Sequence, residues 1–159
     1  MSNQNNDLWV GVDVGSTTVK IAVVDPATEK LLHFTYERHN AMQAQKVHDV
    51  LATAHGLFPD KNFRVAFCGS GGQPFAEATH AFFVQEVVAN ALAVRTTHPE
   101  SRVAIELGGQ DAKVVFFNGK GTELRMNGNC AGGTGAFIDQ MAVLMGCDNQ
   151  QMNDLALQS

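Results

Sequence analysis

The chain has 159 residues, of which 45% are hydrophobic and 17% are charged, and its formal net charge at pH 7 is −5. This composition predicts a folded protein with a buried core and excludes a disordered chain, and the length suits one ordinary domain or two small ones. The negative charge argues against nucleic acid or an anionic membrane as the main partner, because both would repel it.

The N-terminal residues, the apolar runs and the cysteines indicate the cellular setting. Residues 1–7 are polar and lack the apolar segment of a signal peptide. No apolar run approaches the ~18 residues that a membrane helix requires. Cys68, Cys130 and Cys147 leave an odd thiol, which favours a reducing compartment over a disulfide framework. We therefore expect a cytoplasmic protein.

The first hundred residues predict three strands, a helix, a strand and a second helix. Alternating apolar residues predict the strands, at 8–14, 17–25, 30–37 and 64–68. Helical spacing predicts a helix over 43–57, whose apolar face holds Val47, Val50, Leu51, Ala54 and Leu57. The glycine-rich segment 69–72 predicts a turn, with the lining of a cleft as a further role. A helix at about 83–95 is predicted to bury Val84, Val87, Val88, Ala91 and Leu92.

The remaining residues start the same series again. Strands are predicted at 102–107, 112–117 and 122–126, and two helices follow, one after the glycines at 132–135 and one at 148–157. The first of these helices carries Phe137, Met141, Leu144 and Met145 on one face. We predict a first subdomain at 1–100 and the start of a second at 101–159. Because the second series lacks its last strand and helix, we expect the chain to be the front part of a longer protein.

A sixteen-residue pattern occurs twice, at Val10–Asp25 and, 93 residues later, at Val103–Asn118. Without a gap, Asp13 matches Glu106, glycine matches glycine (Gly15, Gly108) and lysine matches lysine (Lys20, Lys113). Each copy predicts a strand that ends in an acid, a tight turn and a second strand. Two such hairpins that face each other can hold a polyphosphate and its metal from both sides.

The first turn offers groups that bind phosphate. In Gly15-Ser16-Thr17-Thr18, small residues leave backbone N–H groups accessible, and the hydroxyls add donors. Asp13 could hold Mg²⁺ through water, and Lys20 could counter phosphate charge, although two strand positions separate it from the turn. The alternative is an ordinary hairpin with an acid at its tip.

The second turn, Gly108-Gly109-Gln110-Asp111, is of the same kind. Gln110 or Asp111 could orient a water for attack on a terminal phosphoryl group, and Glu106 would be a second acid on the metal side. The alternative for Glu106 is a strand-end carboxylate that faces solvent.

Cys130 comes directly before the glycine-rich turn that opens a helix. The positive end of the helix dipole would favour the thiolate, which is the form that binds iron or zinc. A single cysteine cannot hold a cluster, so a symmetric dimer or a distant partner would have to supply the other ligands. The alternative is a small buried cysteine.

These segments together resemble known ATPases. Residues 13–20 resemble the first phosphate motif of the acetate and sugar kinase/Hsp70/actin superfamily. Residues 106–113, followed by Asn127-Gly-Asn-Cys-Ala-Gly-Gly-Thr-Gly-Ala-Phe-Ile-Asp139, resemble the BadF/BadG/BcrA/BcrD ATPase family more specifically. That family comprises activators of 2-hydroxyacyl-CoA dehydratases and the ATPase subunits of benzoyl-CoA reductases. The resemblance covers about residues 8–157.

The resemblance implies an α/β, ribonuclease H-like (actin-like ATPase) fold: a mixed sheet flanked by helices, with one complete unit and the start of a second. It implies ATP or ADP with Mg²⁺ at the two turns, with Gly132, Gly133 and Thr134 contributing to the site. It also implies a homodimer that shares one [4Fe–4S] cluster, with Cys130 among its ligands. ATP hydrolysis would then drive a low-potential electron into an acyl-CoA dehydratase or reductase-type iron–sulfur enzyme.

The sequence departs from the family pattern at several points. The second cluster cysteine and the adenosine motif have no match before residue 159, position 106 is Glu where many members have Asp, and 127–129 replaces the commoner Asn-Asp-Lys. These variants resemble large multidomain activases, in which this unit is N-terminal. Two alternatives stay open: a sugar or acyl kinase of the same superfamily, and a fragment of a nucleotide-binding domain without activity.

Overall fold

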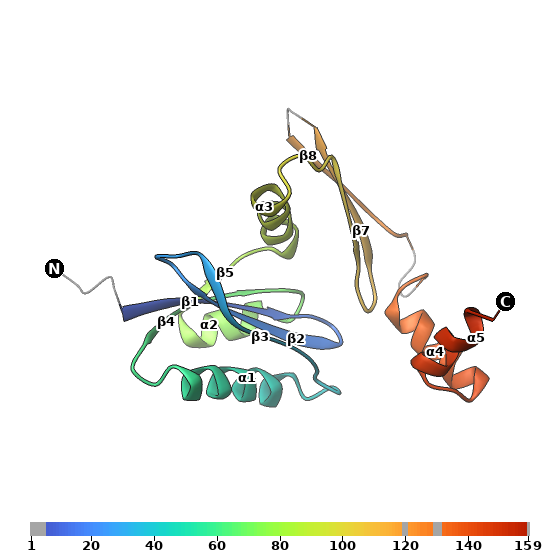
Figure 1. Ribbon diagram of the computed structural model, residues 1–159, viewed down its shortest axis with the longest axis horizontal. Helices are drawn as coiled ribbons and strands as arrows, with labels where there is room; N and C mark the ends of the chain where they lie inside the picture. Colours follow the sequence, from blue (N-terminus) through green and yellow to red (C-terminus); the bar gives the residue numbers. More distant parts are fainter. Residues whose placement is uncertain (1–5, 119–120, 129–131, 159) are drawn as a thin grey trace. The chain divides into compact units, whose positions relative to one another are not determined.

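The computed structural model describes residues 6–118, 121–128 and 132–158. The chain divides into two compact units, Met1–Asn90 and Ala91–Ser159 (Figure 1). The predicted subdomain boundary between residues 100 and 101 stays a prediction.

The first unit is built on a mixed five-stranded sheet with the order β3-β2-β1-β4-β5. Strands β1, β2 and β3 are antiparallel, whereas β1–β4 and β4–β5 pair in parallel. The bounds are β1 Asp7–Val14, β2 Thr18–Asp25, β3 Lys30–Arg38, β4 Asn62–Cys68 and β5 Phe82–Phe83. The first four confirm the strands that the alternating pattern predicted.

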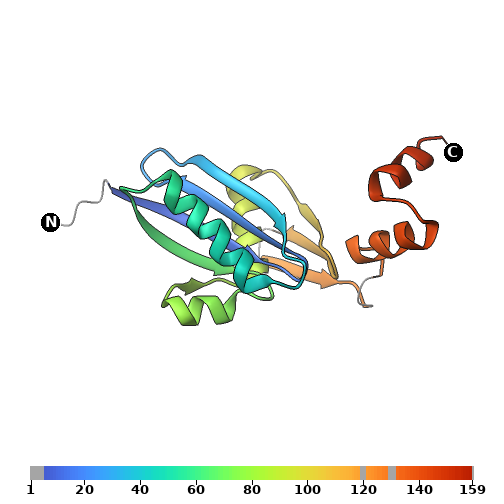
Figure 2. The ribbon, with the colours of Figure 1, turned by 90° about the horizontal axis from the view of Figure 1, so that it is seen from below.

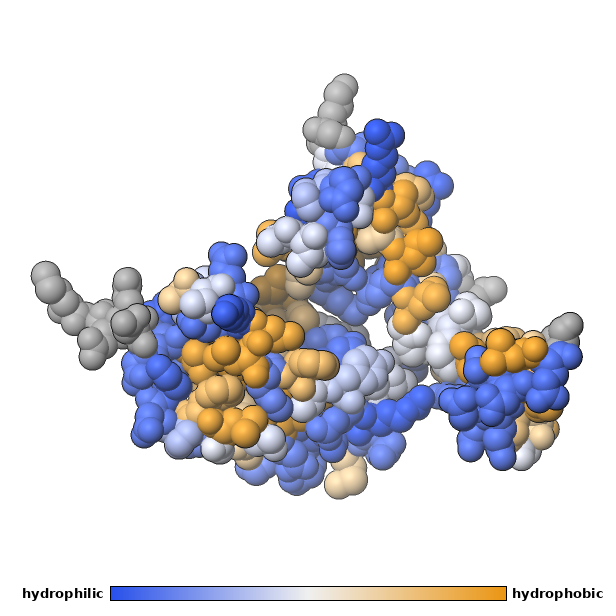
Figure 3. Space-filling view, viewed as in Figure 1, coloured by the Kyte–Doolittle hydropathy of each residue, from blue (hydrophilic) through white to orange (hydrophobic). Residues whose placement is uncertain are grey.

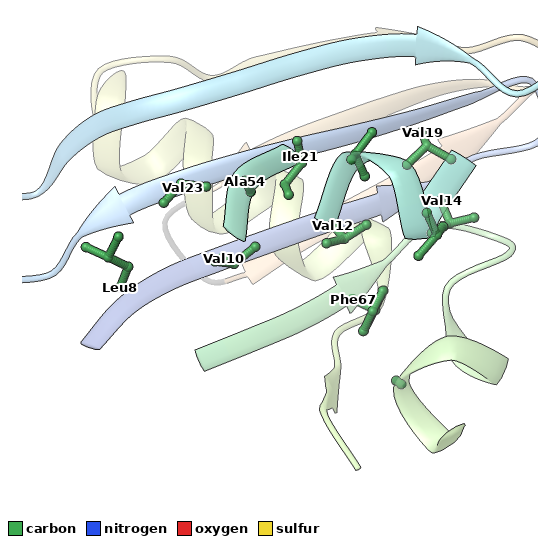
Figure 4. Packing of buried hydrophobic residues seen from close by; sticks show 12 residues of the cluster. Leu8, Val10, Val12, Val14, Val19, Ile21, Val23, Ala54 and Phe67 are labelled. Atoms are coloured by element: carbon green, nitrogen blue, oxygen red, sulfur yellow. The ribbon is translucent and has the colours of Figure 1, made fainter. Parts of the chain in front are cut away.

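Two helices, α1 (Gln43–Leu57) and α2 (Gln73–Thr79), complete the core of this unit. Helix α1 lies across one face of the sheet (Figure 2), and Ala76 of α2 joins the same cluster. Because successive strand residues point to opposite faces, every second residue of β1 and β2 enters this core. The fully buried side chains include Val12, Val14, Val19 and Val23 (Figure 4).

Between residues 73 and 97 the predicted elements are partly wrong. Helix α2 was missed, because seven residues are too few for a periodic pattern; Pro74 in its first turn was the available signal. The helix predicted at 83–95 begins later, as α3 (Glu86–Thr97), since Phe82 and Phe83 pair with β4 instead. Helix α3 buries no side chain, and Leu92 is 66% exposed.

The second unit has a three-stranded antiparallel sheet, β6-β7-β8, and two helices. The bounds are β6 Val103–Leu107, β7 Ala112–Asn118, β8 Gly121–Met126, α4 Gly135–Met145 and α5 Asn149–Ala156. The predicted order of elements is confirmed. The predicted apolar face of α4 is not buried, because Leu144 is 77% exposed and Ala142 is the one buried residue of that helix. A capping box of Asp148 and Gln151 starts α5.

Apolar side chains also gather on the surface of the first unit, as Figure 3 shows for one side of the molecule. On β3 they include Leu31, Phe34 and Tyr36, whose side chains are more than half exposed. Among the described residues, no helix combines the length and the apolar character needed to cross a bilayer.

Candidate functional site

The acid and the lysine of the first repeat lie directly opposite each other. Asp13 near the end of β1 is paired in register with Lys20 on β2, and Lys20 Nζ donates to Asp13 Oδ2 at 2.6 Å. Partial burial acts to lower the pKa of Lys20, but the hydrogen bond and negative charge of Asp13 outweigh it, so this pKa is raised. The ammonium also lies 5.3 Å from the centre of the Tyr36 ring. Here Lys20 binds the acid and does not reach past it to the turn.

The second carboxylate oxygen of Asp13, Oδ1, is buried without a hydrogen-bond partner among the described residues. It points at Gly69, where an added Cβ would lie only 2.3 Å away, and Gly69 has a φ of +86°. Both the space and the backbone conformation therefore require glycine. An acidic oxygen that lacks a protein donor is available to a hydrated Mg²⁺ ion, so the donor chemistry of Asp13 suits this metal.

The glycine-rich segment 69–72 lies against the end of β1. Gly71 donates its N–H to the Val14 carbonyl at 2.8 Å, and a Cβ at Gly71 would lie 3.1 Å from Gln43 Nε2. The segment is thus a turn, as predicted, and it forms part of the wall around Asp13.

The carbonyls of the first phosphate turn, Gly15–Thr18, are held by the protein. Thr18 O accepts from Gly15 N–H at 2.9 Å, and Thr17 O accepts from His39 N–H at 3.2 Å. The Gly15 carbonyl accepts from two side chains, Gln43 Nε2 at 3.2 Å and His39 Nε2 at 3.3 Å. Within the described part of the chain, the N–H groups of Ser16 and Thr17 donate no hydrogen bond. Two adjacent N–H groups of this kind can bind an anion.

The second hairpin repeats the first. Glu106 on β6 is paired in register with Lys113 on β7, and Lys113 Nζ lies 3.5 Å from Glu106 Oε1. Gly108 N–H donates to the Asp111 carbonyl at 2.9 Å, which is the counterpart, 93 residues later, of the bond from Gly15 to Thr18. The lysine is more buried here, with a side chain 10% exposed against 37% for Lys20.

The carbonyls of the second turn, Gly108–Asp111, are held by the start of helix α4. Gly108 O accepts from Gly135 N–H at 3.1 Å, and Gly109 O accepts from Ala136 N–H at 2.7 Å. The hydroxyl of Thr134, a residue that is only 1% exposed, also donates to Gly109 O, at 3.0 Å. For the residues that the structure describes, no hydrogen bond comes from the N–H of Gly109 or of Gln110.

The structure therefore brings most of the predicted site residues together within each unit. In the first unit these are Asp13, Gly15, Ser16, Thr17, Thr18 and Lys20. In the second unit, Gly108, Gly109, Gln110 and Asp111 form the turn, and Thr134 packs on it. Gly132 and Gly133 are exposed and lead into Thr134, and Gly133 has a φ of +70°.

The predicted iron ligand, Cys130, lies outside the described residues. Cys68 and Cys147 are half-buried and form no disulfide among the described residues, and no group of three or more His, Cys, Asp or Glu side chains in the described ranges could hold a metal ion. Sequence reasoning missed His39 and Gln43. Nothing in the sequence marks them, because they are 24 and 28 residues away from the glycine that they contact.

The chain is similar to proteins that are known as dehydratase activators. The chain is 29% identical over 153 residues to the 2-hydroxyisocaproyl-CoA dehydratase activator of Clostridioides difficile, covering 94% of this chain and 57% of that protein. The solved structure of that activator with bound ADPNP superposes with a TM-score of 0.78 at 28% identity, over 96% of this chain and 57% of the other.

A second relative is the (R)-2-hydroxyglutaryl-CoA dehydratase activating ATPase of Acidaminococcus fermentans. It is 30% identical over 150 residues, which cover 92% of this chain and 56% of that protein. The crystal structure of component A of that dehydratase has a TM-score of 0.76 at 24% identity, covering 96% of this chain and 59% of the other. The chain thus spans a little over half the length of both relatives.

These structures confirm the predicted fold class, an actin-like ATPase fold with a mixed sheet flanked by helices. The sequence pattern of the BadF/BadG/BcrA/BcrD ATPase family matches residues 10–159. The chain therefore belongs to the BadF/BadG/BcrA/BcrD ATPase family.

Proposed function

We propose that this chain is the ATP-binding part of an activator ATPase that couples ATP hydrolysis to low-potential electron transfer. The observation that carries the proposal is the repeated turn. In both units a glycine turn lies between an acid and the lysine that pairs with it, and other protein groups bind carbonyls of the turn. Among the described residues, two adjacent N–H groups of each turn have no protein acceptor. Backbone N–H groups in this arrangement bind phosphate oxygens.

Each predicted residue then has a role. The first turn (Gly15, Ser16, Thr17, Thr18) and the glycines of the second (Gly108, Gly109) contact phosphate oxygens, and Lys20 neutralises phosphate charge once it leaves Asp13. Asp13 holds Mg²⁺ through water, and Glu106 is the matching acid of the second hairpin. Gln110, whose side chain is exposed, and Asp111 orient the attacking water. Gly132, Gly133 and Thr134 support the second turn.

The partner and the redox cofactor are proposed by analogy with the family. The relatives named above activate 2-hydroxyacyl-CoA dehydratases, and we propose a dehydratase or benzoyl-CoA reductase-type enzyme as the electron acceptor. Cys130 is assigned to a [4Fe–4S] cluster shared across a homodimer on the resemblance alone, since it lies outside the described residues. A bound cluster would supply the transferred electron. The proposed compartment is the cytoplasm.

A titration of the 159-residue chain with Mg²⁺ and ADPNP, a non-hydrolysable ATP analogue, tests the nucleotide part by calorimetry. We expect saturable binding that is about tenfold weaker in Asp13→Asn, because the neutral amide no longer attracts the hydrated metal. Asp60→Asn, at an exposed acid of the same unit, is the matched control and should bind like the wild type. Equal affinities for all three proteins would show that Asp13 does not hold the metal.

Absence of binding to the wild-type chain would instead favour an inactive nucleotide-domain fragment. That outcome has a physical basis, because the chain covers only 57% of the first relative named above. The cluster part has its own test, which is iron and sulfide content after anaerobic reconstitution beside Cys130→Ser. An iron content that is the same in Cys130→Ser would show that Cys130 is not a cluster ligand and has a structural role.

A further inference from the structure

We infer that His39 is a positioning residue for the first phosphate turn and that it acts as the neutral tautomer with its proton on Nε2. His39 lies in the loop between β3 and α1 and is only 6% exposed. Its backbone N–H donates to Thr17 O, and its ring contacts Gly15 O, so one residue engages two of the turn's carbonyls. The inference rests on the proposed function only for the identity of the ligand.

The tautomer follows from the two ring contacts. Nδ1 accepts the Ala41 N–H at 3.1 Å and therefore carries no proton. Nε2 lies 3.3 Å from the Gly15 carbonyl, which can only accept, so Nε2 must carry the proton. The ring thus joins its own loop to the turn through one acceptor and one donor.

The loop that carries His39 has an unusual backbone. Asn40 has a φ of +48° and Ala41 a φ of +63°, and Ala41 has a side chain that disfavours this left-handed region. Two consecutive non-glycine residues of this kind persist only when the surrounding structure imposes them. The bond from Ala41 N–H to the ring of His39 is one such constraint, and it sets the direction in which the ring points.

In the second unit, the start of helix α4 has the role that His39 and Gln43 have in the first unit. Gly133 lies 93 residues after Asn40, the offset of the sequence repeat, and it too has a positive φ, of +70°. From there the chain enters α4, whose backbone N–H groups bind the carbonyls of the second turn directly. In the first unit, two side chains bind the equivalent carbonyl, that of Gly15. A side-chain contact can be removed by one substitution, whereas the backbone N–H groups of a helix end cannot be removed in this way.

With its carbonyls held, the first turn presents the N–H groups of Ser16 and Thr17 for a phosphate group before any ligand arrives. Loss of the ring contact should let the turn rotate and so cost affinity, even though His39 is not expected to touch the ligand. This separates His39 from the residues that bind phosphate directly.

Two variants that differ by one methylene group test the inference. In His39→Gln the amide nitrogen reaches about as far from Cβ as Nε2 does, so it can still donate to Gly15 O. In His39→Asn the amide is shorter and can replace only the near nitrogen that accepts from Ala41. We expect His39→Gln to keep the wild-type Kd for Mg-ADPNP within about twofold and His39→Asn to raise it about tenfold.

NMR on the free chain gives a readout that does not depend on nucleotide. The ring nitrogen shifts of His39 should report a proton on Nε2, and the amide signals of Ser16 and Thr17 should move in His39→Asn but not in His39→Gln. A proton on Nδ1, or equal amide shifts in the two variants, would overturn the inference. If the wild-type chain binds no nucleotide while the amide pattern holds, the proposed function fails and the role of His39 in the turn stands.

Discussion

The two phosphate turns share their geometry and differ in what holds them. In both, an acid before the turn pairs with a lysine after it, and the same closing bond runs from the glycine to the fourth residue. In both, two N–H groups have no protein acceptor among the described residues. The first is held by the side chains of His39 and Gln43, and the second by backbone N–H groups at the start of α4 and by the hydroxyl of Thr134. The turn itself is therefore the repeated element, and different chemical groups support it in the two units.

A second difference concerns the acids. Asp13 is enclosed by the Gly69–Gly72 turn, which leaves one of its carboxylate oxygens buried and without a partner among the described residues. In the second unit, Glu106 has a longer side chain, and the nitrogen–oxygen distance to its lysine is 3.5 Å, against 2.6 Å in the first. We therefore expect the interactions of Asp13 to depend more strongly on the surrounding residues than those of Glu106 do.

The largest effect should come from Gly69→Ala, which disrupts the contact between Gly69 and the acid of the first hairpin. The added Cβ would lie 2.3 Å from Asp13 Oδ1 and 2.5 Å from the Val14 carbonyl, and alanine disfavours a φ of +86°. We expect a loss of about 3 kcal/mol in the free energy of unfolding, measured by denaturant titration. Gly11→Ala in the same sheet meets no atom within 4 Å and is the control. Equal stabilities of the two variants would contradict the observed contact.

Gly108→Val should be next, and it tests whether the second turn is needed as much as the first. A Cβ at Gly108 would lie 2.9 Å from the Asp111 carbonyl, so the closing bond of the turn cannot survive unchanged. We expect affinity for Mg-ADPNP to fall by at least tenfold in calorimetry while circular dichroism stays the same. Gly128→Val, in open space, is the matched control. If Gly108→Val binds normally, the phosphates lie elsewhere.

Thr134→Val sharpens the contrast between the two supports. Valine keeps the shape of threonine but removes the buried hydroxyl that donates to Gly109 O at 3.0 Å. We expect a loss of about 1–2 kcal/mol in stability by thermal unfolding. Thr97→Val removes a hydroxyl whose bond, to Ala93 O, is exposed, and the change should be much smaller. If the stability of Thr134→Val equals that of the wild type, the backbone N–H groups of α4 alone hold the turn.

The smallest effect is expected from pH, through Lys20. Its folded-state pKa is raised above the ordinary value of 10.5, so the ion pair with Asp13 stabilises the fold fully below pH 10.5. That stabilisation is lost as the pH rises through the folded-state pKa. The Tm difference between wild type and Lys20→Met should therefore shrink at alkaline pH, and solvent screening keeps it small because the lysine side chain is 37% exposed. A difference that grows with pH would reverse the assigned sign. Lys30→Met, at an exposed lysine, is the control.

The sequence repeat predicted the two hairpins because strand alternation and turn residues are local signals. The pairing of Asp13 with Lys20 is implied by the same repeat, since a four-residue turn places positions seven apart opposite each other. The supports could not be predicted in this way. His39, Gln43 and Gly69 reach the first hairpin from distant parts of the chain, and no periodicity encodes such contacts.

The wrong prediction of burial at α3 has a related cause, and the exposed apolar face of α4 illustrates it too. An apolar stripe on a helix predicts burial against some surface, but the stripe does not identify that surface. Val88, Leu92 and Leu144 lie on such stripes and are more than half exposed. Short elements fail for a different reason: β5 has two residues and α2 has seven, so each pattern has one or two repeats, too few to stand out from the surrounding sequence.

The ion pairs in the two hairpins make each free turn close to electroneutral. Asp13 and Lys20 cancel each other's charge, and so do Glu106 and Lys113. Neither hairpin then has a net field that would draw a divalent cation out of water. We therefore expect Mg²⁺ to arrive together with the nucleotide whose phosphates it neutralises, and a titration with Mg²⁺ alone to show no saturable binding. Saturable binding of Mg²⁺ alone that is lost in Asp13→Asn would contradict this expectation.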